Sequence, residues 1–175
     1  MKPIYIIVTI TIVGIVGFLV YTQSQNTKPQ QMTPSASTPL PTPTTEPKEV
    51  NYQASFAIFT NGTFRVFTAA MYHNLSADVY IQADNPNIVH VKKKGLTFDD
   101  FFKTLPFMLT KDCLTTGTGQ TFCTGKAGTL KFYLNGVKTD DLLVREIKDG
   151  DKALITFGLE TEAQIQQQLT QVSKL

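Results

Sequence analysis

The sequence predicts an α+β domain with a mainly antiparallel sheet, one short packed helix and a C-terminal helix, behind an N-terminal transmembrane helix. Three observations predict this class. Short apolar runs alternate with turn sequences along residues 50–175, as in antiparallel sheets. Two stretches instead repeat their apolar residues at helical spacing. One apolar run near the N-terminus is long enough to cross a bilayer.

Residues 4–21 form that run, which reads IYIIVTITIVGIVGFLVY. At about 1.5 Å per helical residue it matches the hydrocarbon thickness of a bilayer. Lys2 precedes the run and the next charge is Lys28, which predicts a cytoplasmic start at residues 1–3 and an extracytoplasmic remainder. A cleaved secretory signal is the alternative. We favour a permanent single-pass anchor in the cell membrane, because the run is long and its exit lacks spaced small residues.

Residues 22–49 predict a disordered stalk. This stretch holds six prolines and seven threonines and no aromatic residue. Such a composition buries too little apolar surface to offset the entropy lost on ordering. The extracytoplasmic globular domain then covers residues 50–175, which is long enough for one core.

Two strand pairs are expected in the first half of this domain. The runs at 54–60 and 63–69 flank Asn61-Gly62, which predicts a tight hairpin because both turn positions require a positive φ. The runs at 78–82 and 87–93 surround the turn sequence ADNP. The aromatic residues of this half are expected to be mainly core, and the sequence leaves open whether some of them form an exposed recognition face: Phe56, Phe59, Phe64, Phe67, Tyr72 and Tyr80.

A helix is predicted after Thr97, which is expected to cap it, with Asp99 and Asp100 in the first turn. Pro106 ends it. Its apolar residues recur at i, i+3, i+4 and i+7: Phe98, Phe101, Phe102 and Leu105.

Further strands are predicted at 107–115, 129–136, 142–147 and 152–158. A C-terminal helix opens at Thr161, where Gln164 completes a capping box. Its apolar face holds Ile165, Leu169 and Val172.

The two cysteines, Cys113 and Cys123, enclose the segment LTTGTGQTF. In an oxidising compartment a disulfide is the default, and the glycine- and threonine-rich segment predicts a hairpin between its ends. A two-cysteine metal or redox site is the alternative, but it lacks CxxC spacing and a nearby histidine.

Residues 130–158, which read LKFYLNGVKTDDLLVREIKDGDKALITFG, resemble the second half of a ubiquitin-like β-grasp fold. Residues 87–102, NIVHVKKKGLTFDDFF, are similar to a motif of uncharacterised membrane-anchored prokaryotic proteins, in which a histidine-containing strand precedes a "GDFF" helix. Here the helix reads DDFF. The resemblance covers residues 87–158 and implies a β-grasp-like sheet but no activity.

Some of these relatives carry additional histidines near this strand, which makes a metal site conceivable in them. This chain has Tyr80 at the position where such a histidine is expected, and only His90 and the distant His73 remain. A lone strand histidine is more often packed or solvated than a ligand, and two imidazoles do not make a zinc site. We therefore expect no metal centre and no cofactor.

The globular domain carries thirteen Lys and Arg against twelve Asp and Glu, which gives no electrostatic argument for nucleic-acid binding. The run Lys92-Lys93-Lys94 is either a patch for an anionic partner or, more commonly, a solvated strand end that discourages edge pairing. Asn61 and Asn74 begin N-glycosylation sequons, which agrees weakly with exposure outside the cell.

No catalytic signature is found in the sequence. It has no HExxH, no GxSxG and no phosphate-binding glycine loop. The paired carboxylates Asp99-Asp100, Asp140-Asp141 and Asp149/Asp151 lie at an expected helix start or in turns, where capping is their usual role. The β-grasp likeness suggests a sulfur carrier or protein modifier, but that chemistry needs a C-terminal Gly-Gly and this sequence ends QVSKL.

The sequence thus favours a non-enzymatic, surface-displayed module for binding or assembly at the cell envelope, with the membrane and an unidentified envelope component as partners. The alternative is a domain that binds a small ligand or a metal with His90 and neighbouring aromatic residues. An enzyme requires a pocket that gathers Asp, His or Lys residues from distant positions.

Overall fold

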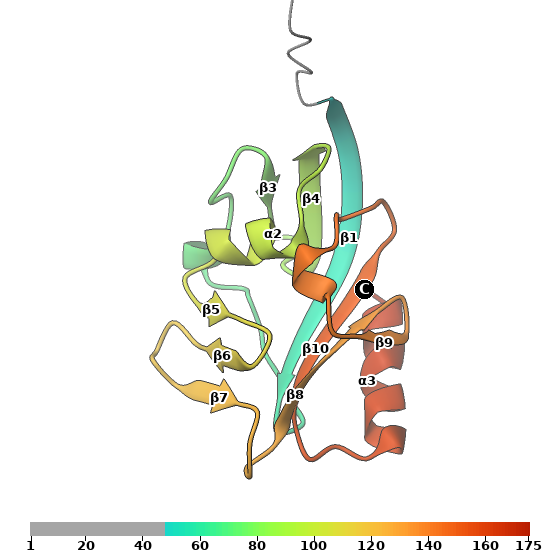
Figure 1. Ribbon diagram of the computed structural model, residues 1–175. Coiled ribbons are helices and arrows are strands. Elements are labelled where there is room, and N and C mark those ends of the chain that lie inside the picture. The colour runs from blue at the N-terminus through green and yellow to red at the C-terminus, as the bar shows by residue number, and fades with distance from the viewer. Residues whose placement is uncertain (1–47) are drawn as a thin grey trace, which may run out of the picture. The chain divides into compact units, whose positions relative to one another are not determined.

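The computed structural model describes residues 48–175, and all elements below belong to that part of the chain. The predicted transmembrane helix at 4–21 lies outside the described residues, as does nearly all of the predicted stalk. Across residues 48–175, no helix is long and apolar enough to cross a membrane. The described part is α+β, with a mixed sheet, a smaller sheet and two α-helices (Figure 1).

The main sheet has the strand order β3-β4-β1-β10-β8-β9, with β2 paired to the end of β1. Neighbouring strands are antiparallel except β1 and β10, which are parallel, so the prediction of a mainly antiparallel sheet is confirmed. The strands are β1 (Glu49–Thr60), β2 (Thr63–Phe64), β3 (Val79–Tyr80), β4 (Ile88–Lys93), β8 (Thr129–Leu134), β9 (Val137–Thr139) and β10 (Lys152–Gly158).

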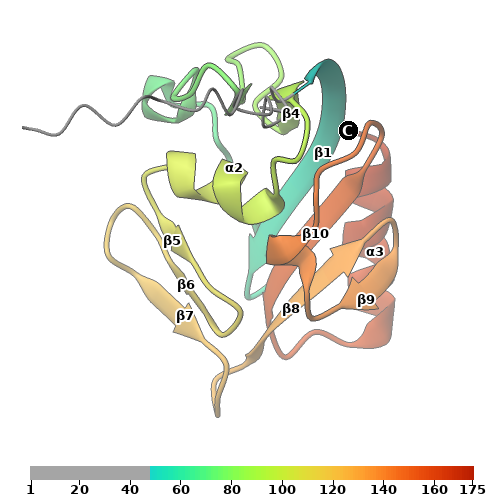
Figure 2. The same cartoon turned by 45° about the horizontal axis from the view of Figure 1, so that its top comes forward.

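The central strand β1 changes partner along its length. Its first part, up to Ser55, pairs with β4, and its second part, from Ser55 to Thr60, pairs with β10. Every side chain from Ala54 to Thr60 is buried, because both faces of the sheet are covered there. One face lies against α2 and the small sheet and the other against α3 (Figure 2).

Two Asn-Gly turns close hairpins of the main sheet. Asn61 and Gly62, between β1 and β2, have φ values of 50° and 76°. Asn135 and Gly136, between β8 and β9, have φ values of 53° and 82°. Asparagine and glycine adopt this left-handed region more readily than other residues, and the turn predicted at Asn61-Gly62 is confirmed.

The helix α2 (Phe98–Thr104) covers one face of the main sheet. It begins with a capping box, in which Thr97 Oγ1 accepts from the Asp100 amide at 3.1 Å and the Asp100 carboxylate accepts from the Thr97 amide at 2.8 Å. Its three phenylalanines are buried, and the rings of Phe101 and Phe102 lie 5.2 and 5.8 Å from that of Phe56. The predicted cap and apolar face are confirmed.

The helix α3 (Glu162–Ser173) covers the opposite face. Thr161 and Gln164 form the predicted capping box. Ile165 and Val172 are buried with Ala57, Phe59 and Leu154 of the sheet. Leu169 is partly buried beside them, so the predicted apolar face is confirmed.

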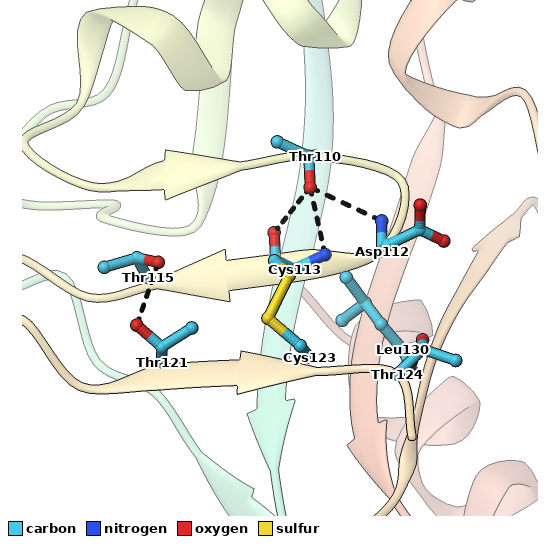
Figure 3. The surroundings of a disulfide bond; sticks show 8 residues. All are labelled: Thr110, Asp112, Cys113, Thr115, Thr121, Cys123, Thr124 and Leu130. Atoms are coloured by element: carbon cyan, nitrogen blue, oxygen red, sulfur yellow. Dashed lines mark hydrogen bonds between the residues drawn. A yellow bond between two sulfur atoms is a disulfide. The ribbon is translucent and has the colours of Figure 1, made fainter.

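The small sheet contains β5 (Met108–Leu109), β6 (Cys113–Thr115) and β7 (Thr121–Cys123). Cys113 and Cys123 are direct cross-strand partners and form a disulfide, as predicted (Figure 3). Leu114 and Phe122 between them are buried in the same core as α2. Leu109 of β5 is buried in this core too, and the disulfide links the other two strands, β6 and β7.

Several predicted strands differ from the structure. The strand expected at 54–60 begins earlier, at Glu49, which is the last residue of the predicted stalk, and the strand expected at 78–82 is only Val79–Tyr80. The stretch 107–115 is two strands, because Thr110 Oγ1 accepts from the Cys113 amide at 3.0 Å and stabilises a turn. The stretch 63–69 is a strand only at β2, after which the chain leaves the ladder. The stretch 142–147 contains a 3-10 helix, η2 (Leu142–Val144), which buries Leu142 completely. A second 3-10 helix, η1 (Ala70–Tyr72), precedes His73.

Candidate functional site

His90 lies on β4 directly opposite Tyr80 of β3. The two rings are stacked, with centroids 5.3 Å apart and an interplanar angle of 17°. Burial lowers the pKa of His90, the Lys92 ammonium lowers it further, and Asp84 opposes both effects. The imidazole is therefore neutral at pH 7, and its buried Nε2 has no hydrogen-bond partner within residues 48–175.

His73 is used differently, since its Nε2 lies 2.8 Å from the carbonyl oxygen of Phe67 and ties the end of η1 to the preceding loop. In the part of the chain that the structure describes, no three His, Cys, Asp or Glu side chains gather to hold a metal ion. His73 and His90 thus lack the third ligand that a metal centre needs.

The lysine run at the end of β4 is partly engaged. Lys92 Nζ donates to Asn51 Oδ1 at 2.6 Å, and Lys93 Nζ lies 3.8 Å from Asp78 Oδ2. Lys94 is exposed. The run holds neighbouring segments together as well as presenting charge, and an anionic partner for it remains a prediction.

Both sequon asparagines are exposed, and both have a positive φ: Asn61 in the β1–β2 turn and Asn74, at 54°, after η1. Their side chains are accessible to modification, and glycosylation remains a prediction.

Most of the paired carboxylates have local structural partners. Asp99 forms an ion pair with Lys103, and Asp141 with Arg145. These partners raise the pKa of Lys103 and hold the pKa of Asp141 below its usual value. Asp149 accepts from the Gln53 amide at 2.8 Å, and Asp151 accepts from the Lys148 amide at 2.9 Å.

A cleft of about 320 Å³ lies between the main sheet and the small sheet, and we name it the Arg65 cleft. Its walls are mainly apolar. Arg65 contributes the cleft's only charged side chain, and Thr116, Gly117 and Thr118 form its polar edge. The other lining residues are Ile58, Phe64, Val66, Phe67, Met71, Tyr72, Phe107 and Leu114.

The Arg65 guanidinium is held in place by two contacts beside the cleft. Its Nε donates to Thr60 Oγ1 at 2.6 Å, and its central carbon lies 5.3 Å from the centre of the Phe122 ring. It forms no ion pair with any carboxylate of residues 48–175. Its remaining N–H groups are therefore available to an anionic ligand.

The rim of the cleft exposes apolar side chains, with Val66 63% and Met71 54% exposed. Phe64 and Tyr72 are only partly buried, whereas Phe56, Phe59 and Phe67 belong to the core. Three of the six aromatic residues are thus fully core, and a recognition face formed by the others remains a prediction. The cleft itself was not predicted, because its lining comes from three separate segments, residues 58–72, 107 and 114–118.

Comparison of the chain with protein-family models, with curated proteins and with solved structures gave no match. The likeness of residues 87–158 to an uncharacterised membrane-anchored family therefore remains a prediction.

Proposed function

We propose that this protein is a non-enzymatic binding module, anchored by residues 4–21 and displayed outside the cell, whose Arg65 cleft binds an apolar ligand that carries a carboxylate. The observation that carries this proposal is the unpaired Arg65 guanidinium at the edge of an apolar cleft. Binding pockets commonly combine apolar walls with a few placed polar groups.

Two features of the fold support the proposal of a binding module displayed outside the cell. The order β4-β1-β10-β8-β9, with a parallel central pair, agrees with our placing the sheet in the β-grasp class. The Cys113–Cys123 disulfide is consistent with an oxidising compartment and therefore with display outside the membrane.

The chemistry of the cleft favours a carboxylate over a neutral head group. A guanidinium forms charge-assisted, often bidentate hydrogen bonds with carboxylates. A neutral head group leaves the charge of Arg65 without a counter-ion in a partly enclosed position. Apolar atoms that enter the cleft add about 0.8 kcal/mol for each methylene group removed from water.

Isothermal titration of the full-length chain with octanoate, octanol and octylamine tests the proposal. We expect octanoate to bind most tightly, and Arg65→Gln to weaken it about tenfold. Arg145→Gln is the matched control, because Arg145 is the only other arginine and lies outside the cleft. Equal affinity for octanol and octanoate, or no loss with Arg65→Gln, would refute the carboxylate site.

The alternative, ligand or metal binding at His90, is favoured by the unpartnered Nε2 of a neutral imidazole. Two observations weaken it. Tyr80 covers one face of the ring, and His90 lines none of the cavities described here. Zn²⁺ uptake by the full-length chain that disappears in His90→Gln would support it over the Arg65 cleft.

A further inference from the structure

A second hollow, of about 450 Å³, lies on the opposite face of the main sheet, between α3 and the β1–β2 turn. Four glutamines of α3 line it at positions i, i+3, i+4 and i+7: Gln164, Gln167, Gln168 and Gln171. Asn61 and Gly62 face them from the turn, and Phe59 and Leu159 supply apolar surface. We name this hollow the glutamine pocket.

Two of its polar side chains are buried, which distinguishes it from an ordinary solvated helix face. Gln168 is only 6% exposed, and its Oε1 has no hydrogen-bond partner in the described chain. The Glu160 side chain is 4% exposed. An unpaired buried amide destabilises a fold, so a leucine at position 168 is expected to pack at least as well.

The pocket carries no net charge. Glu160 is its only ionisable lining residue, and its Oε2 lies 2.7 Å from Lys131 Nζ. Its Oε1 accepts from Thr156 Oγ1 at 3.1 Å. The carboxylate is therefore already neutralised within the fold, and the pocket offers an ionic ligand no counter-charge.

Neutral amides select a particular kind of ligand. A glutamine amide has two N–H donors and a carbonyl acceptor, although the Gln164 Oε1 already accepts from Thr161 in the capping box. Each sugar hydroxyl is likewise both a donor and an acceptor. A pyranose also presents an apolar ring face, which the exposed side chain of Leu159 can contact. A charged or wholly apolar ligand leaves these amides unpaired.

We propose that the glutamine pocket binds a neutral saccharide, with Gln168 as its central contact. A ligand hydroxyl that donates to Gln168 Oε1 supplies the one hydrogen bond that this atom lacks in the described chain. This site is independent of the Arg65 cleft, since the two hollows share no lining residue.

The test uses the full-length chain, labelled with ¹⁵N and titrated with an N-acetylglucosamine tetramer and with cellotetraose. We expect saturable shifts at the side-chain amides of the pocket glutamines with one saccharide or both. Gln168→Leu is expected to weaken binding at least tenfold without lowering Tm. Gln171→Ala, an exposed position that leaves the core unchanged, is expected to weaken binding about threefold.

Gln166→Leu is the matched control, because Gln166 lies on the same helix outside the pocket and donates to Glu162. It should bind as the wild type does. The proposal is overturned if neither saccharide gives saturable shifts at millimolar concentration, or if the shifts map elsewhere. Wild-type affinity in Gln168→Leu and Gln171→Ala would also overturn it. None of these results bears on octanoate binding, so the two sites are judged separately.

Discussion

The two faces of the main sheet are covered in different ways. One face is covered by two separate pieces, α2 and the disulfide-linked small sheet, and an apolar cleft remains between the small sheet and the main sheet. The other face is covered by the single helix α3, whose row of glutamines borders a polar hollow beside the β1–β2 turn. A sheet with a buried core on each face can therefore carry two chemically distinct recessed surfaces.

The largest loss of stability is expected from a substitution in the core on the α2 face of the main sheet. Phe56→Ala removes a fully buried ring that contacts Phe67, Phe101 and Phe102. We expect it to lower the free energy of unfolding by about 3–5 kcal/mol, measured by urea denaturation. Ile165→Ala on the α3 side should cost about 2–3 kcal/mol. A larger loss for Ile165→Ala would reverse the ranking of the two faces.

The second-largest loss of stability is expected from breaking the buried ion pair between Lys131 and Glu160 beside the glutamine pocket. Lys131→Met leaves the Glu160 carboxylate charged and buried, which we expect to cost about 3 kcal/mol at neutral pH. Lys131→Met with Glu160→Leu should recover most of that loss. Lys138→Met, at an exposed position of β9, is the control and should be nearly neutral.

The same pair predicts a pH dependence. Burial raises the pKa of Glu160, but hydrogen bonds from Lys131 and Thr156 outweigh burial and hold this pKa below its ordinary value of 4.5. The pair's contribution is therefore present above pH 4.5 and lost as the pH falls through the lowered pKa. The stability difference between wild type and Lys131→Met should be largest near pH 7 and shrink on acidification. A constant difference would show that charge is not the cause.

Loss of the disulfide should lower the free energy of unfolding by a smaller amount, and it should also weaken ligand binding at the Arg65 cleft. Replacing both Cys113 and Cys123 by serine opens a short loop and should cost about 2–3 kcal/mol. Because Leu114 and residues 116–118 line the cleft, octanoate affinity should fall as well. Saccharide binding at the glutamine pocket should not change, which a parallel titration of the double variant checks.

Local interactions are what the sequence predicted well. The Asn61-Gly62 turn, the cap at Thr97 and the Thr161–Gln164 capping box depend on residues within a few positions of each other, and all three are in the structure. The disulfide was predictable for the same reason, since its cysteines close a short hairpin. The strand predicted at 142–147 was wrong because the apolar residues of this stretch fit either a strand or an irregular segment that fills the core.

Interactions between distant segments were not predictable from these patterns. The parallel pairing of Ser55 with Lys152 joins opposite ends of the domain, and no local motif specifies it. The Arg65 cleft requires three segments to meet. The ion pair between Lys131 and Glu160 likewise joins β8 to the segment before α3. The identity of one residue does not indicate which distant residue it will contact in the fold.

The two ladders of β1 also have a mechanical consequence. The described chain begins immediately before β1, so a force applied through an N-terminal tether enters the fold along this strand (Figure 1). β1 is hydrogen-bonded to β4 and then to β10, and extraction along its axis must shear both ladders together. A pull along β1 is therefore resisted by two sets of strand hydrogen bonds at once.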